Sequence, residues 1–208
     1  MKNLIELLKD IPTGNVCDSN GRGGNMDAGI KPLGKQMKAV GPAFTVRCQP
    51  GDNLTIHKAI YEAPKGSVLV IDAQGFANAG AFGDILATAC THQGIVGVIL
   101  DGACRDANDI EEMGFPLFCR ALNPGGTVKE SVGALNQTIQ CGGVIVNPGD
   151  VIVGDRDGVA VIQSEKAEAV IKAALEKNKA EQAIRDQILQ GKSTIDIFKF
   201  NDKLAQKK

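Results

Sequence analysis

The chain has 208 residues, of which 43% are hydrophobic, 23% charged and 4% aromatic. This length and apolar content suit one well-buried domain and exclude a disordered chain. The net charge of −1 and the lack of Trp argue against a nucleic-acid surface built on cations and stacked bases. No apolar run is long enough to span a membrane. We therefore expect one soluble α/β domain over residues 1–208, without nucleic-acid or membrane partners.

The cysteines form no metal-binding pattern. No two of them make a CxxC unit, and only two histidines could assist, so a zinc site is not expected. The segment Met1–Lys9 has the charge pattern of an amphipathic helix rather than of a signal peptide. We expect a cytoplasmic protein whose reduced thiols belong to the core; the cysteines are Cys17, Cys48, Cys90, Cys104, Cys119 and Cys141.

Short β-branched runs bounded by Gly, Pro or Asp alternate with helical patterns. In chain order the sequence predicts a helix over Leu4–Leu8, a strand over Ala43–Cys48, a helix over Asn53–Glu62, a strand over Val68–Asp72, a helix over Asp84–His92, a strand over Ile95–Leu100, a helix over Ala107–Met113, strands over Pro116–Cys119, Gly143–Val146, Val151–Val153 and Val159–Ile162, and a long helix over about 166–190.

The order of these elements predicts the architecture. Alternating strands and helices in the middle of the chain indicate parallel strands with crossover helices. Residues 141–163 hold only short strands and turns, which indicates an added β-rich layer. The tail Lys203–Lys208 is expected to fray. The fold class is α/β, with a parallel central sheet and a long C-terminal helix.

The segment from Val68 to Asp106 carries the candidate chemistry. A Gly- and Ala-rich loop over Ala73–Gly83 is expected after one strand, and a short loop over Asp101–Cys104 after the next. If the two strands are parallel neighbours, both loops leave the same sheet edge, which is where such sheets bind ligands. Asp84 and the Arg105-Asp106 pair should then share one crevice.

Each of these groups suits an anionic substrate beside a metal. The amides of Gly83, Asp84, Ile85 and Leu86 lie at a helix N-terminus, where unpaired N–H groups favour a carboxylate or phosphate. The guanidinium of Arg105 matches a carboxylate, and the oxygens of Asp84 and Asp106 match Mg²⁺ or Mn²⁺. A helix cap and a surface ion pair would leave the same residues in the sequence, so the pattern alone does not decide.

Other candidate motifs are weaker. His57 and His92 have no partnered nucleophile, and the chain lacks GxSxG, a Walker loop and GxGxxG after a strand. The run Gly21–Gly24 could cradle an anion or simply be a flexible loop. Lys129 could form a Schiff base or a second anion contact, although an exposed lysine is the default interpretation.

Asp84, followed after twenty residues by Arg105-Asp106, resembles the D-x20-R-D signature of the RraA-like family, which includes the class II 4-hydroxy-4-methyl-2-oxoglutarate/4-carboxy-4-hydroxy-2-oxoadipate aldolases. The likeness runs from about Thr13 to Gly191. Further blocks that resemble the family are Gly41–Val46, Gly51–Leu54, Val70–Ala73, Val98–Ala103, Gly114–Phe118, Gly142–Val144 and Pro148–Asp150.

The resemblance implies a β/β/α swivelling-domain-like layered fold, assembled as homotrimers or homohexamers with sites between subunits. It implies an Mg²⁺- or Mn²⁺-dependent lyase that cleaves 4-hydroxy-2-oxo acids to pyruvate and also decarboxylates oxaloacetate. The roles it implies are a substrate-binding Arg105, a metal-binding Asp106, an Asp84 that holds the metal's water, and a carboxylate-binding backbone around Ile85 and Leu86. It also implies pocket roles for Asn53, Lys129 and Asp18, and a neighbouring-subunit role for Glu181.

Two rival functions come with the same resemblance. Some members resemble regulators that dock on ribonuclease E, and the acidic Asp84 favours the enzyme over that role. Relatives have also carried a demethylmenaquinone methyltransferase label, but the chain has no Gly-rich S-adenosylmethionine loop after its first long strand. An enzyme of the same fold that acts on another 2-oxo or hydroxy acid is a third interpretation.

Overall fold

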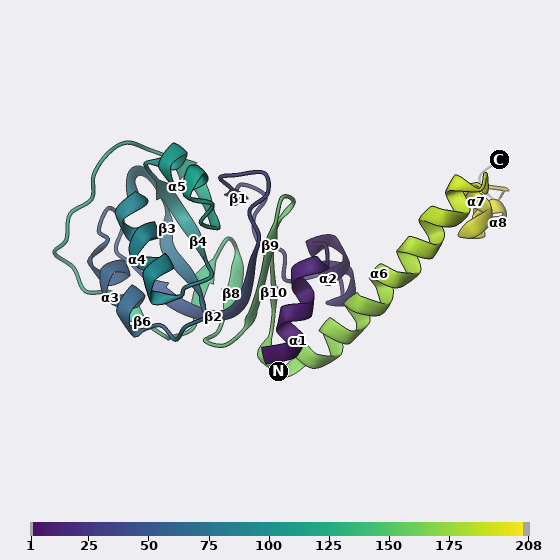
Figure 1. Ribbon diagram of the computed structural model, residues 1–208, viewed down its shortest axis with the longest axis horizontal. Helices are drawn as coiled ribbons and strands as arrows, with labels where there is room; N and C mark the ends of the chain where they lie inside the picture. The colour runs from purple at the N-terminus through teal and green to yellow at the C-terminus, as the bar shows by residue number, and fades with distance from the viewer. Residues whose placement is uncertain (1, 206–208) are drawn as a thin grey trace.

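The computed structural model describes residues 2–205 (Figure 1). Its strands are β1 (Lys31–Pro32), β2 (Ala39–Arg47), β3 (Val68–Phe82), β4 (Gly97–Cys104), β5 (Leu117–Leu122), β6 (Ala134–Leu135), β7 (Ile139–Cys141), β8 (Val144–Val146), β9 (Val151–Asp155) and β10 (Gly158–Ile162). Its helices are α1 (Lys2–Glu6), η1 (Leu7–Asp10), α2 (Thr13–Ser19), α3 (Leu54–Glu62), α4 (Asp84–Gln93), α5 (Ala107–Met113), η2 (Ser164–Lys166), α6 (Ala167–Leu189), α7 (Thr194–Ile197) and α8 (Asn201–Ala205).

The predicted parallel centre is confirmed. The main sheet has the order β1-β5-β4-β3-β2-β9-β10, and β2, β3, β4 and β5 are parallel neighbours. The predicted β-rich layer is also present, because β9 and β10 form an antiparallel hairpin that continues the sheet beyond β2. β7 and β8 form a separate two-stranded sheet. The strand β2 begins four residues before the expected Ala43, and this early part, Ala39–Pro42, pairs with β9.

The alternation of side chains along β3 divides the core into two layers. Leu69 and Ile71 pack with apolar residues of α3, α4 and α5 on one face. Val68 and Val70 pack on the other face with the β7–β8 pair and with Met26. A third cluster joins α1, α2 and the first turns of α6 to the β9–β10 hairpin. The helices α3, α4 and α5 on one side of Figure 1 and the helices α1, α2 and α6 on the other therefore pack in separate cores.

The prediction of two loops, over Ala73–Gly83 and Asp101–Cys104, was wrong. Residues Ala73–Gly83 mostly continue β3 to Phe82, and Asp101–Cys104 are the end of β4. The two strands remain paired through Phe82 and Cys104, with three register shifts on the way. The positive φ of Gln74 (57°) lies within the first shift. Small residues at the bulges let the two backbones stay close. The same Gly- and Ala-rich composition had indicated a loop in the sequence.

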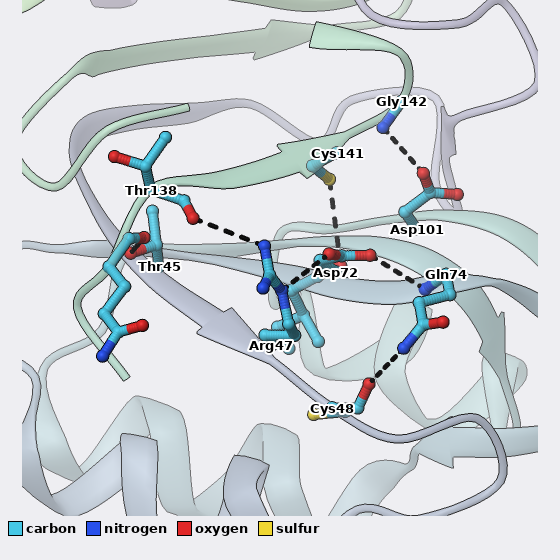
Figure 2. A network of polar contacts seen from close by, with 11 residues as sticks. Thr45, Arg47, Cys48, Asp72, Gln74, Asp101, Thr138, Cys141 and Gly142 are labelled. Atoms are coloured by element: carbon cyan, nitrogen blue, oxygen red, sulfur yellow. Dashed lines mark hydrogen bonds and ion pairs between the residues drawn. The ribbon is translucent and has the colours of Figure 1, made fainter. Parts of the chain in front are cut away.

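A row of polar side chains fastens the β7–β8 pair onto the parallel strands (Figure 2). Arg47, Asp72 and Asp101 are neighbours across β2, β3 and β4. Arg47 donates to Thr138 O (3.5 Å) and lies 3.4 Å from an Asp72 oxygen. The other aspartate, Asp101, accepts the Gly142 N–H (2.7 Å). Both carboxylates are buried, so this network is a structural support on the sheet face opposite α3–α5.

The predicted C-terminal helix is confirmed as α6, but most of it does not belong to the body. Its last buried residue is Ala174, and Figure 1 shows the rest projecting outward with α7 and α8 at its end. The expected frayed tail begins inside α8, and residues 206–208 lie outside the described range. All six cysteines are free; five are buried, as predicted, whereas Cys17 is only half-buried. Within residues 2–205, no helix has both the length and the apolar content to cross a membrane.

Candidate functional site

A small cavity of about 180 Å³ lies where β3 and β4 end. We call it the site cavity. The helix starts of α3 and α4 form two of its walls, and the segment after β5 closes it. Its lining residues are Asn53, His57, Gly80, Gly83, Asp84, Ile85, Leu86, Arg105, Gly126, Thr127 and Lys129. The structure thus brings together every predicted substrate-binding residue.

The first turn of α4 forms one wall of the site cavity. Its N-cap, Gly83, is extended (φ −142°, ψ −175°), so the chain turns directly from β3 into the helix. The Leu86 N–H donates to Gly83 O (3.1 Å). Asp84 and Ile85 therefore supply the first-turn N–H groups that remain for a ligand, and the helix dipole favours an anion there. Ile85 is 71% exposed, which leaves this wall accessible.

Arg105 forms the adjacent wall, and Asp106, which does not itself line the site cavity, lies against Gly83 and Arg105. The Arg105 N–H donates to Phe82 O (2.9 Å). This hydrogen bond holds the end of β4 beside the end of β3. The guanidinium Nε of Arg105 lies 3.2 Å from an oxygen of Asp106. Asp106 adopts a left-handed conformation (φ 56°) as the N-cap of α5, which turns its side chain back toward Gly83. A Cβ on Gly83 would collide with this carboxylate, so alanine at this position would push the carboxylate aside.

A third wall joins α3 to the segment that carries Lys129. The carboxylate of Asp52 accepts N–H groups from Leu54 (2.8 Å), Glu130 (2.8 Å) and Ser131 (2.7 Å). These backbone hydrogen bonds, that of Leu54 foremost, lower the pKa of Asp52 because they stabilise its charged form. Lys129 is thereby fixed beside the start of α3.

His57 is a cavity residue to which the sequence assigned no role. It lies one helical turn after Asn53, a spacing that places both side chains on one helix face and could have revealed it. Burial, and then the charge of Lys129, lower the pKa of His57. At neutral pH the cavity thus contains the cations Arg105 and Lys129, a neutral imidazole and the carboxylate of Asp84, a balance that favours an anion.

Asp18 and Glu181, the two acids expected near the site, lie away from the site cavity. Lys177 Nζ is 3.1 Å from an Asp18 oxygen and 3.3 Å from a Glu181 oxygen, so both acids share one lysine between α2 and α6. These helices pack with the β9–β10 hairpin, away from α3, α4 and α5 (Figure 1). Within one chain, Asp18 and Glu181 take no part in the site cavity.

A model of the RraA-like family, described as Aldolase/RraA, matches residues 13–161. The chain belongs to the RraA-like family. A relative from Halalkalibacterium halodurans, named "Putative 4-hydroxy-4-methyl-2-oxoglutarate aldolase", is 39% identical over 90% of this chain and 91% of its own.

Solved structures confirm the RraA-like layered fold that the resemblance implied. An uncharacterized protein from Pseudomonas syringae pv. tomato has a TM-score of 0.84 and 26% identity, covering 93% of this chain and 91% of its own. The RNA-processing inhibitor RraA from Thermus thermophilus has a TM-score of 0.68 and 27% identity, covering 74% of this chain and 93% of its own. The match to that shorter chain agrees with a common RraA-like core.

The acidic residues of the site fit one class of metal. Among residues 2–205, no group of three His, Cys, Asp or Glu side chains could form a closed metal cage. Asp84 lines the site cavity, and Asp106 lies against the neighbouring Gly83. Mg²⁺ typically keeps several waters and needs one or two carboxylates plus oxygens of the substrate. This donor set therefore suits Mg²⁺ or Mn²⁺ and does not suit zinc.

Proposed function

We propose that this RraA-like protein is a divalent-metal-dependent lyase that cleaves 4-hydroxy-2-oxo acids of the 4-hydroxy-4-methyl-2-oxoglutarate type to pyruvate. The observation that carries the proposal is the convergence of Arg105, Asp84 and the first turn of α4 on one small cavity. The name of the relative from H. halodurans supports the same reaction class.

The 2-oxo acid end of the substrate would bind between Arg105 and α4. The side chain of Arg105 is 43% exposed, and its guanidinium can donate two parallel hydrogen bonds to a carboxylate or a carboxylate–keto pair. The N–H groups of Asp84 and Ile85 would bind the carboxylate from the other side. Lys129, on the third wall, would attract the remaining acidic part of the substrate.

Cleavage breaks the C3–C4 bond, and the electron pair moves onto the keto oxygen as a pyruvate enolate. A divalent cation held by Asp106, with its water held by Asp84, would supply Lewis-acid stabilisation of that charge. Arg105 would neutralise the enolate oxygen through its fixed hydrogen bonds. The carboxylate of Asp84 would orient the water that takes up the C4 hydroxyl proton as the C4 carbonyl forms. Protonation of the enolate at C3 then gives pyruvate.

The same arrangement would decarboxylate oxaloacetate. Loss of CO₂ from that acid also leaves the pyruvate enolate, so Arg105 would stabilise the same charge. The hydroxyl proton acceptor is not needed in this reaction, because oxaloacetate in its keto form has no hydroxyl group. We therefore include oxaloacetate decarboxylation as a side activity.

The working form would be a homo-oligomer, a trimer or a hexamer. The outer part of α6 and the segment after it have no packing partner in the described chain, yet they carry large exposed apolar side chains. These are Ile188, Leu189, Ile195, Phe198, Phe200 and Leu204. A second copy would cover this surface, and an arm of this length would let Glu181 approach a neighbouring site cavity.

The direct test is Arg105→Ala, assayed for pyruvate with Mg²⁺ and with a chelator. The proposal expects loss of pyruvate formation from both substrates, because enolate binding is lost in each. Arg156→Ala, in the exposed β9–β10 turn, is the matched control and should keep wild-type rates. Near-wild-type pyruvate production by Arg105→Ala would overturn the assignment.

Regulation of RNA processing is the second candidate, and the likeness to the Thermus RraA structure favours it. A regulator would inhibit ribonuclease E at stoichiometric concentrations and would be indifferent to Asp84→Asn. The lyase would lose turnover in that variant. Measuring both activities on the same protein preparation separates the two functions.

A further inference from the structure

Of the described residues that line the site cavity, His57 is the only one with an imidazole. Its side chain is half-buried on α3, one helical turn after Asn53. The backbone N–H of His57 donates to Asn53 O (3.4 Å), whereas within residues 2–205 neither ring nitrogen makes a hydrogen bond or an ion pair. Both ring nitrogens are therefore available to a molecule in the cavity.

The surroundings of this imidazole keep it in the basic form at neutral pH. Burial, and then the nearby charge of Lys129, lower the pKa of His57. A neutral imidazole can accept a proton from carbon, and the imidazolium that results is an acid strong enough to return it. Arg105 cannot take this part, because its guanidinium does not give up a proton in proteins.

The proposed cleavage has a second proton transfer, which puts a hydrogen on C3 of the pyruvate enolate. When the carboxylate is bound by Arg105 and the first turn of α4, C3 lies two bonds from the carboxylate carbon and inside the cavity. The volume of the cavity is only about 180 Å³, so a ligand anchored on one wall contacts the others. His57 and Asp84 lie on different walls, so the transfer to C3 and the uptake of the C4 hydroxyl proton use different groups.

We infer that His57 is the catalytic residue that transfers a proton to C3 of the pyruvate enolate. This inference rests on the proposed function and assigns a step that the other cavity residues leave open. The imidazolium N–H bond breaks, the enolate electron pair forms the C3–H bond, and the keto C=O bond is restored. The neutral imidazole then takes a proton from solvent, which balances the proton that the C4 hydroxyl releases through the water beside Asp84.

The first measurement asks whether the imidazole contacts the ligand. The chain has two histidines, so the Cε1–H protons of the full-length protein give two NMR signals, which the His57→Gln variant assigns. Pyruvate added with Mg²⁺ should shift the signal of His57. The signal of His92, which is exposed at the end of α4, should stay in place. An unmoved His57 signal under saturating pyruvate would overturn the inference.

The second measurement is the exchange of the pyruvate methyl protons for deuterium in D₂O, which runs the C3 proton transfer in both directions. With Mg²⁺ the wild type should exchange these protons, and His57→Gln should do so about 100-fold more slowly. Lys58→Gln is the matched control and should keep the wild-type rate, because Lys58 is the next residue on α3, is exposed and lies outside the site cavity. No exchange by the wild type, or undiminished exchange by His57→Gln, would overturn the inference.

Release of CO₂ from oxaloacetate separates proton transfer from the shape of the cavity. The C–C bond breaks before C3 is protonated, so His57→Gln should release CO₂ at nearly the wild-type rate while its exchange is lost. Equal losses of both would show that His57 only shapes the cavity, and would overturn the inference. The smaller variant His57→Asn is measured beside it, so that one misfolded variant does not decide the result. If the metal-loaded wild type cleaves no 4-hydroxy-2-oxo acid, the proposed function fails, and pyruvate exchange still decides the role of His57.

Discussion

Gly83→Ala tests the geometry that joins the two halves of the site. A Cβ at this position would overlap Asp106 Oδ2 and lie 3.3 Å from both Cγ and Nε of Arg105. The carboxylate must retreat by about 1 Å to reach ordinary contact, whereas the extended backbone of Gly83 accepts alanine without strain. A displacement of this size in a catalytic group costs about 100-fold in rate, or about 2.7 kcal/mol in the barrier.

The assay is kcat/KM for pyruvate formation at saturating Mg²⁺, together with the melting temperature. We expect the loss in rate with a melting temperature close to that of the wild type, because the clash is with the Asp106 side chain, which is 32% exposed and can move. Gly14→Ala, on α2 with open space around the added methyl, is the control: it should keep the wild-type rate and should not lower the melting temperature, because alanine favours a helix over glycine. A fully active Gly83→Ala would refute the placement of Asp106 in the site.

Three further predictions concern stability and assembly. Asp101→Ala removes a buried carboxylate that binds Arg120 Nε (2.6 Å) and the Gly142 N–H (2.7 Å), so it should lower the free energy of unfolding by about 2–4 kcal/mol; an unchanged denaturation midpoint would contradict this. The pKa of Asp52 lies below its ordinary 3.8, so its contribution to stability is complete above that pH and is lost as the pH falls through the lower, folded-state pKa. Acid unfolding should therefore be less steep for Asp52→Asn, and identical pH profiles would oppose the argument. Deletion of residues 192–208 should leave the body folded, because the last buried residue of α6 precedes Gly191, but it should weaken the oligomer in light scattering; an unchanged mass would exclude this segment from the interface.

The regular parts of the fold were predictable because their patterns are local. Val68–Ile71 and Val98–Leu100 are continuous apolar runs, which is how strands buried on both faces appear in a sequence. The end of β3 was not predictable, since its pairing with β4 depends on register shifts that no local pattern encodes. α2 was missed because its seven residues, Thr13–Ser19, lack a strong apolar period.

The site was predictable where it follows from strand order. Parallel neighbours place Asp84 and Arg105 at one edge, and the structure brings both to one cavity. The unpaired oxygen of Asn53 was hidden, because it depends on a contact with Ala81 from a distant strand. The left-handed conformation of Asp106, at the turn from β4 into α5, was hidden as well, because nothing in the local sequence marks it. Features of the site that depend on contacts between distant parts of the chain could therefore not be predicted from the sequence.

The most direct test of the account is pyruvate formation from 4-hydroxy-4-methyl-2-oxoglutarate by the purified protein, measured with Mg²⁺ or Mn²⁺ and again after chelation. The account predicts turnover that requires the metal and disappears in Arg105→Ala. Absence of turnover with either metal, or turnover that persists with the chelator, would contradict it.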